Sequence, residues 1–457
     1  MNWSLLSHSL LISSLVAVLA GVLGFTTALA LACVPPQWRR LLLGAALVAL
    51  ALPPFLITNT WLDLLGQQGL LRPWLPVSIY STGGAVWLLT LLYWPITALV
   101  ALGAWARLEP AQLEADPALR GGALVRCLLW PMARVSVGYA AVLTFVLALN
   151  NFSVPVILQV PVFAEELWLA FTTRLNDAGA WAAAGPLVAA PLALLLLLRR
   201  AEIAWPRLQG SAPSRALRRQ LGPVWRRLAL LGALVLILLS TGLPLTQLAA
   251  RARTWAELPN LFRAAPDVIW NSFAYAAAAA TLAMAAGQLG ARFRVGRAAW
   301  LLFFVPGILL GRMLIAALNE TVIYGTSTLV ILAFALRYLA IAWEGAASAR
   351  RAMDRDLTDA ARLGGARGWA LFRHVHWPQI APSLCAAWYV IYLLCLWDVE
   401  TLVLIQPPGG ETLALRVFNL LHYGHHAQAN ALCLTLLALA LAPLGVWSIL
   451  RRCFRSS

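Results

Sequence analysis

The chain has 457 residues, a mean hydropathy of +0.78 and only 11% charged residues. Such a composition excludes an ordinary soluble domain, so we expect an all-α, polytopic membrane protein whose main solvent is lipid. The formal charge of +16 comes from arginine alone, and the absence of lysine excludes a Walker A phosphate-binding loop and Schiff-base catalysis.

Apolar runs long enough to cross a bilayer recur along the chain, since a spanning helix needs about 20 residues. The first run has no charged leader and no small-residue cleavage site, so we interpret it as a retained span rather than a signal peptide. We predict about eleven transmembrane helices, near residues 10–33, 41–60, 85–105, 135–152, 179–198, 228–248, 269–290, 298–317, 322–343, 380–398 and 429–450.

Arginines mark one side of these predicted spans. On this assignment 26 arginines fall on one side and 6 on the other, while Arg312 and Arg337 lie within spans. Because basic loops stay in the cytoplasm, the N-terminus is predicted outside and the C-terminus inside a bacterial inner membrane. The basic charge therefore reflects topology, and no nucleic-acid partner is expected.

Two loops of the chain repeat one pattern. Asp116, Gly121-Gly122 and Trp130-Pro131 in the first correspond to Asp359, Gly364-Gly365 and Trp377-Pro378 in the second, although Pro117 replaces an alanine and the first copy is shorter. We therefore predict two modules in the same orientation, related by an axis along the membrane normal. They comprise residues 1–200 (about five spans) and 228–457 (about six), joined by a basic cytoplasmic linker at 201–227.

The second loop reads Asp359-Ala360-Ala361, then Gly365, then Val375-His376-Trp377-Pro378. Alanines favour a short, closely packing helix, glycines permit a tight reversal, and proline suits the first turn of the next span. This spacing resembles the Glu-Ala-Ala loop of binding-protein-dependent importer permeases, with Asp for Glu and Trp for Leu. The resemblance implies a helix that docks on a cytoplasmic ATPase and moves with it. The residues so assigned are Asp359, Ala360, Ala361, Gly364, Gly365, Val375, Trp377 and Pro378, with Asp116, Gly121, Gly122, Trp130 and Pro131 in the degenerate first copy.

A plain structural loop is the alternative for both copies. Most of the chain resembles the fused two-module permeases of ferric-iron ABC importers, whose relatives carry thiamine, polyamines or phosphonates. The stretch 407–413 followed by His422-Tyr423-Gly424 is also similar to a segment of those permeases. The resemblance implies a transport subunit that is not an enzyme, served by a cytoplasmic ABC ATPase dimer and a periplasmic substrate-binding protein.

Ferric iron is the first expectation for the solute, and it rests on the resemblance alone. No cofactor, catalytic cluster or metal site is predicted, which disfavours a membrane enzyme. A secondary transporter with fused repeats remains an alternative, although it would need ion-coupling acids near the middle of the membrane.

Polar residues end two equivalent spans. Asn150, Asn151 and Ser153 end the fourth, while Asp398 and Glu400 end the tenth. Because charges inside the membrane usually face a cavity or a partner, we predict that these residues line a polar path for a cationic or metal-bearing solute. Contact with water at the outer interface is the alternative.

Overall fold

The computed structural model describes residues 3–106, 108, 113, 119–172, 185–193, 196, 214–291, 298–351, 353–423 and 425–453. Within these ranges the ordered elements are helices and no strand occurs, which confirms the predicted all-α, polytopic class. Seven of the described helices are long and apolar enough to cross a membrane, or up to nine if each bent pair counts as one span. The expected count of eleven is thus not confirmed.

Helix breaks explain part of the difference. Helices α2 (Pro36–Ala51) and α3 (Pro54–Leu65) meet at 91°, and α15 (Ala299–Phe304) is separated from α16 (Gly307–Leu318). Pro53 and Pro306 lie within the two breaks, and proline disfavours the helical conformation in the residue before it. Apolar runs that predicted single spans are therefore two short helices each. Most of the predicted span at 179–198 lies outside the described residues.

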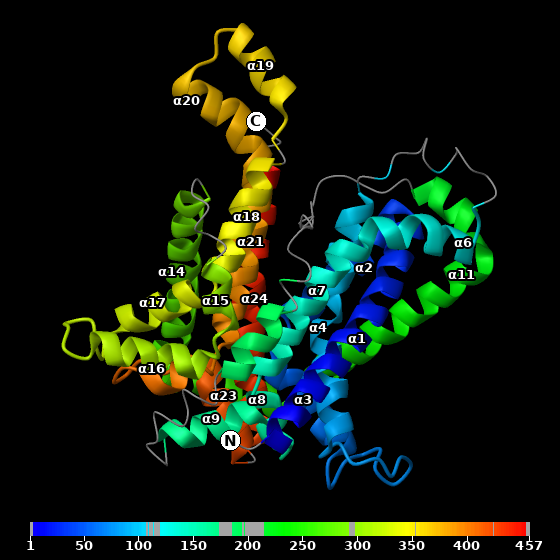
Figure 1. Cartoon of the computed structure of the whole chain (residues 1–457). Helices are drawn as coiled ribbons and strands as arrows, with labels where there is room; N and C mark the ends of the chain where they lie inside the picture. The colour runs from blue at the N-terminus through cyan, green and yellow to red at the C-terminus, as the bar shows by residue number, and fades with distance from the viewer. Residues whose placement is uncertain are drawn as a thin grey trace.

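The chain forms two halves with a similar succession of described elements, although the single helix α4 corresponds to the bent pair α17 and α18 (Figure 1). Counted from their Trp-Pro starts, the equivalent helices α7 and α21 both have 21 residues. The N-terminal half contains, besides α2 and α3, α1 (Trp3–Cys33), α4 (Thr82–Trp105), α6 (Gly122–Leu124), η1 (Val125–Leu129), α7 (Trp130–Asn150), α8 (Ser153–Ile157) and α9 (Phe163–Thr172). The C-terminal half contains, besides α15 and α16, α14 (Pro266–Gly290), α17 (Ser327–Arg337), α18 (Leu339–Arg351), α19 (Arg355–Leu363), α20 (Gly368–Leu371), η4 (Phe372–His376), α21 (Trp377–Trp397), α22 (Leu402–Ile405), α23 (Leu413–His422) and α24 (His426–Cys453).

Four elements connect the halves: α11 (Ser214–Ile237), η2 (Leu238–Gly242), α12 (Leu243–Ala250) and α13 (Ala252–Ala264). Helix α11 begins within the segment predicted as the linker and packs along α1 of the N-terminal half. Gly222 bends it with a φ of 78°, a value that glycine adopts without steric cost. The extra span therefore lies against the first half, although it precedes the second in sequence.

Three π-helical turns share one local cause. Each of η1, η2 and η4 ends two residues before a proline: Pro131, Pro244 and Pro378. Proline cannot donate to the carbonyl four residues back, and its ring crowds that carbonyl. Widening the turn to i→i+5 relieves the crowding, as in the bond from the Trp377 N–H to the Phe372 carbonyl. The two Trp-Pro motifs thus enter their long helices by the same geometry.

Each half contains a close helix crossing at a glycine of its first helix. A Cβ on Gly24 of α1 would lie 2.5 Å from the Trp94 carbonyl oxygen of α4, and one on Gly287 of α14 would lie 2.7 Å from the Ala342 carbonyl carbon of α18. Small residues let helix backbones approach closely inside a membrane. The two glycines therefore set the α1–α4 and α14–α18 crossings.

We predict that Gly24→Ala and Gly287→Ala each lower stability by about 1–3 kcal/mol, because the backbones must separate to admit a methyl group. Gly21→Ala on α1 is the matched control, since its Cβ would have no neighbour within 4 Å. Thermal unfolding of the purified variants in detergent measures the effect. Equal midpoints for Gly24→Ala and Gly21→Ala would contradict the assigned crossing.

Candidate functional site

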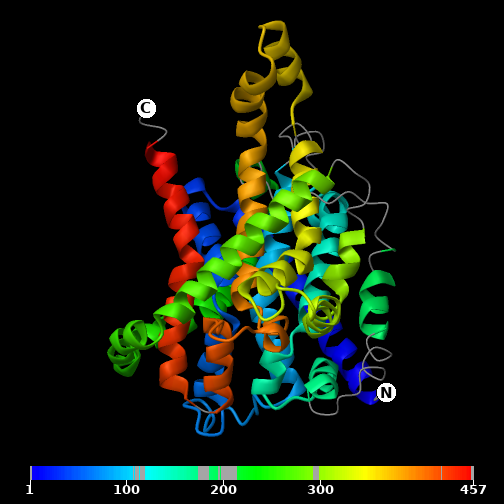
Figure 2. The ribbon, with the colours of Figure 1, turned by 90° about the vertical axis from the view of Figure 1, so that its left-hand side faces the viewer.

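Helices α19 and α20 form a hairpin that stands clear of the helix bundle, above α18 and α21 (Figures 1 and 2). Asp354 caps α19 by accepting hydrogen bonds from the N–H groups of Asp356 and Leu357. The Asp354 N–H in turn donates to Gln379 Oε1 of α21 at 2.8 Å. The base of the hairpin is thus tied to the long helix that follows it.

A Schellman motif closes α19. The Ala366 N–H donates to the Ala361 carbonyl and the Gly365 N–H to the Arg362 carbonyl, both at 3.0 Å. Gly365 has a φ of 87°, whereas Gly364 has an ordinary helical φ of −73°. Of the two glycines assigned to the reversal, only Gly365 needs to be glycine for conformational reasons.

We predict that Gly365→Ala costs about 1–2 kcal/mol locally, the penalty of a left-handed conformation for a residue with a Cβ. Gly364→Ala is the matched control and should be nearly neutral, since its Cβ would make an ordinary 3.4 Å contact. Hydrogen exchange of the α19 amides measures local opening. Faster exchange in the Gly364 variant than in the Gly365 variant would refute the assignment.

The other residues assigned to this loop lie on its accessible surface. Asp359 is exposed and pairs with Arg362 at 3.3 Å, Ala360 is exposed, and Ala361 and Val375 are half-buried. Trp377 and Pro378 are exposed where η4 joins α21. Large apolar side chains are also exposed here: Leu363 by 90%, Trp369 by 70% and Leu357 by 50%. A hairpin with this much uncovered apolar surface has the character of a docking element.

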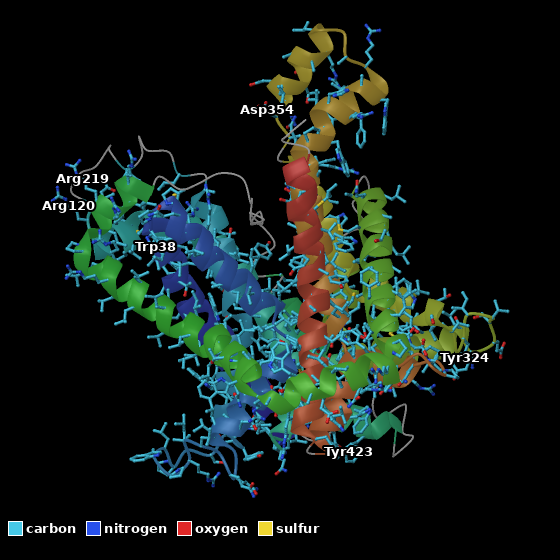
Figure 3. All side chains as sticks on the ribbon, turned by 180° about the vertical axis from the view of Figure 1, so that it is seen from behind. Trp38, Arg120, Arg219, Tyr324, Asp354 and Tyr423 are labelled. Carbon is cyan, nitrogen blue, oxygen red and sulfur yellow. The ribbon has the colours of Figure 1, made fainter. Side chains whose placement is uncertain are left out.

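The first copy of the loop is placed differently. The Gly121 N–H donates to the Gln220 carbonyl of α11 at 2.9 Å, and a Cβ on Gly121 or Gly122 would lie 3.1–3.2 Å from the Trp225 ring. Arg120 and Arg219 accordingly lie side by side in Figure 3. This part of the first loop packs on α11, whereas the second loop projects. Asp116 lies outside the described residues.

Backbone geometry also changes the alignment of the two copies. Gly121 has a φ of 55°, and Gly368, at the same distance from its Trp-Pro, has a φ of 53°. Gly121 is therefore the structural equivalent of Gly368 rather than of Gly364. The shortening that the glycine pairs suggested disappears under this alignment. Trp130 and Pro131 begin α7 as Trp377 and Pro378 begin α21.

The two carboxylates predicted for the path are buried in an ion-pair network with Arg337. The Arg337 guanidinium lies 3.1 Å from Asp398 and 2.6 Å from Glu400. Tyr338 donates its hydroxyl proton to Asp398 at 2.9 Å, and Asp398 accepts the Thr401 N–H at 2.9 Å. Asp398 and Glu400 are each only 7% exposed, so the network is buried inside the protein.

The N-terminal half contains a neutral version of this arrangement. Asn151 and Asp398 both cap the C-terminus of a 21-residue helix, and the Asn151 Oδ1 accepts the Val154 N–H at 3.1 Å. The Asn151 amide donates to the Tyr93 hydroxyl at 3.3 Å, and Tyr93 sits on α4 where Tyr338 follows α17. Leu92 occupies the position equivalent to Arg337. The same turn thus forms with and without charge.

One hydrogen bond of the network joins the halves. The Phe152 N–H donates to Glu400 Oε1 at 3.2 Å, and Asn150 and Ser153 are buried beside it in sequence. The five polar residues predicted for the path therefore lie in two equivalent turns, of which Phe152 and Glu400 are in direct contact. Arg337 falls within a predicted span, but the sequence pattern does not pair it with these acids. The arginine is itself the signal that could have revealed the pairing, because an arginine in the middle of a membrane needs a carboxylate at the same depth.

We predict that Arg337→Leu lowers stability by about 3–5 kcal/mol, because it leaves two buried carboxylates uncompensated. The triple variant Arg337→Leu, Asp398→Asn, Glu400→Ser gives this turn the chemistry of the N-terminal half and should recover most of the loss. Thermal unfolding in detergent compares the two variants. A triple variant less stable than the single one would show that charge itself holds the turn.

A cavity of about 130 Å³ lies between the two halves, inward from these turns. Residues at equivalent positions of the two halves line it: Ile96 and Ile341, Leu99 and Glu344, Leu147 and Leu394. The pseudo-twofold axis that relates the two halves therefore passes through the cavity. Its walls are mainly apolar, and Glu344 is the acid among its lining residues. The predicted path residues end the lining helices but do not themselves line the cavity.

Fold and site together define a multi-pass membrane protein made of two similar halves with a cavity between them. A stretch of 139 residues, 30% of this chain, is 26% identical to the 2-aminoethylphosphonate transport system permease protein PhnV of Salmonella paratyphi A and covers 52% of it. The putrescine transport system permease protein PotI of Escherichia coli is 28% identical over 103 residues, covering 22% of this chain and 37% of that protein. The spermidine/putrescine transport system permease protein PotC of Escherichia coli is 28% identical over 91 residues, covering 20% and 34%.

The chain thus matches about half the length of its first relatives. No family model matches it, and no solved structure does. The relatives are transport-system permeases, which are not themselves enzymes, and they support the prediction of an ABC importer permease. The named solutes are a phosphonate and polyamines, so the expected resemblance to ferric-iron permeases is not confirmed and ferric iron is not supported.

Proposed function

We propose that the chain is the membrane permease of an ABC importer, in which the two halves flank a path for a small solute. The α19–α20 hairpin is the observation that carries this proposal. It projects from one end of the bundle (Figure 2). The Leu363 and Trp369 side chains on it are largely exposed. A cytoplasmic ABC ATPase dimer is the partner that would cover this surface.

The sidedness of the proposal follows from the placement of charge. Asp354, Arg120 and Arg219 lie on the part of the molecule toward the hairpin, and Tyr423 lies at the opposite end (Figure 3). With the hairpin in the cytoplasm, the basic loops satisfy the positive-inside rule of an inner-membrane protein. The N-terminus is then outside, and a periplasmic binding protein would deliver the solute to the end that carries Tyr423.

The path would run between the turns that carry Asn150, Asn151 and Ser153 on one side and Asp398 and Glu400 on the other. From there it would enter the central cavity. Arg337 neutralises part of the acidic charge, so the turns as they stand carry one excess negative charge in the membrane interior. An excess of carboxylate suits a solute with a cationic group.

The solute proposed is a small organic amine. The solutes named for the relatives, 2-aminoethylphosphonate, putrescine and spermidine, share a primary amino group. Thiamine, the other expectation of the same class, also carries positive charge. Uptake of each labelled compound by cells that express the chain with its ATPase and binding protein tests the class. Uptake of ferric iron in place of these compounds would contradict the proposal of an amine solute.

We predict that Leu363→Glu and Trp369→Glu each abolish co-purification of the ATPase, because a charge is placed on an apolar docking surface. Val322→Glu is the control, since Val322 is 95% exposed in the turn between α16 and α17, away from the hairpin. Affinity purification from native membranes, followed by mass spectrometry, measures the partner. If no Walker-motif ATPase co-purifies with the wild-type chain, the result favours the alternative of a secondary transporter.

A further inference from the structure

Glu344 is an acid in the wall of the central cavity that the path residues do not include. It lies on α18, three residues beyond Ile341 in the direction of the hairpin, and it is 6% exposed. Its equivalent on α4 is Leu99, so a glutamate lines one side of the cavity where a leucine lines the other. A carboxylate in an apolar cavity is costly unless a cation accompanies it.

Arg351 provides such a cation from outside the cavity. Its Nη2 lies 2.6 Å from Glu344 Oε1, although the two residues are about two helical turns apart on α18. The Arg351 side chain is 45% exposed, whereas that of Glu344 is 8% exposed. The guanidinium therefore reaches inward from a partly hydrated position. Leaving Glu344 would return Arg351 to water rather than strand it in the membrane.

The root of the docking hairpin lies directly beside this ion pair. Arg351 is the last residue of α18, and α19 begins at Arg355. Arg350 donates to the Gln288 carbonyl of α14 at 2.6 Å, which fixes the neighbouring side of the same turn. A change in the partner of Glu344 therefore alters the junction between the helix bundle and the hairpin.

From these contacts we infer that Glu344 binds the ammonium group of the transported solute in the central cavity, displacing Arg351. The inference rests on the proposed function and names the residue and the chemical group at the inner part of the path. An ammonium donates to the carboxylate as Arg351 does, so the charge in the cavity stays balanced when the partners exchange. The released Arg351 lies at the base of the hairpin, which gives the ATPase a contact that depends on the presence of solute.

Equilibrium binding of radiolabelled putrescine to the full chain in lipid nanodiscs tests this. Wild type should bind saturably, and 1,4-butanediol, which has the same carbon skeleton without charge, should not compete. Glu344→Gln should weaken binding by about tenfold or more, the value of a charged hydrogen bond. Glu344→Asp should keep most of the affinity, and Arg351→Gln should bind at least as tightly as wild type because the competing cation is gone.

A charge swap separates recognition from a structural role. Glu344→Leu should lose binding, and adding Leu99→Glu should restore it, because the cavity presents both positions. The residue equivalent to Arg351 in the first half is Ala106, so the swapped acid has no matching arginine. A purely structural Glu344–Arg351 pair would not be rescued in this way. Size-exclusion profiles identify the variants that fold. If Glu344→Leu does not fold, the binding affinities of Glu344→Asp and Arg351→Gln test the inference instead.

Three results would overturn the inference. Arg351→Gln could lose binding as strongly as Glu344→Gln, the folded swap variant could bind no better than Glu344→Leu, or wild type could bind none of putrescine, spermidine and 2-aminoethylphosphonate. In the last case, retained co-purification of the ATPase through the hairpin would leave the proposed permease function standing. Loss of that co-purification as well would remove both.

Discussion

The pairing of Arg337 with Asp398 and Glu400 is the constraint around which the C-terminal half is arranged. Charges taken out of water remain only where geometry satisfies them, and four separate elements meet here to do so. The last residue of α17 is Arg337, Asp398 caps the end of α21, and a Cβ on Gly307 of α16 would collide with the Arg337 guanidinium. Glu400 extends the network to the Phe152 N–H of the other half. Helix breaks that look like interruptions of a span are thus the means of bringing these groups together.

The two halves show how a repeated scaffold can carry unequal chemistry. Their long helices start with the same widened turn before a proline and end in the same asparagine or aspartate cap. Charge is then added on one side only, since Leu92 and Leu99 occupy the positions equivalent to Arg337 and Glu344. The two repeated loops are unequal as well, because the Gly121 N–H is hydrogen-bonded to α11 while the second hairpin projects. A fused chain permits this division, as each half evolves its own sequence within one fold.

Much of the candidate site could be read in the sequence, although the contacts within it could not. The spacing from Asp359 to Pro378 predicted a helix, a turn and an entry into a span, and α19, the Gly365 reversal and the start of α21 occur in that order. Polar residues were also noted at the ends of equivalent spans. Their partners were not found, because Arg337 and Glu400 lie 63 positions apart and only packing joins them. The sequence gives no signal for Glu344, because this residue directly follows an apolar run and looks like the end of a span.

The sequence by itself determined the all-α, polytopic class, and it predicted the repeated modules and the segment that forms the α19–α20 hairpin. Those properties follow from local hydropathy and from turn residues, which act over a few positions along the chain. Only the tertiary structure decided where the apolar runs break, that α11 packs on the first loop, and that Asp398 and Glu400 are paired with Arg337. These depend on which helices lie side by side, because the free energy of a buried charge is set by its neighbours in space and not by its neighbours in sequence.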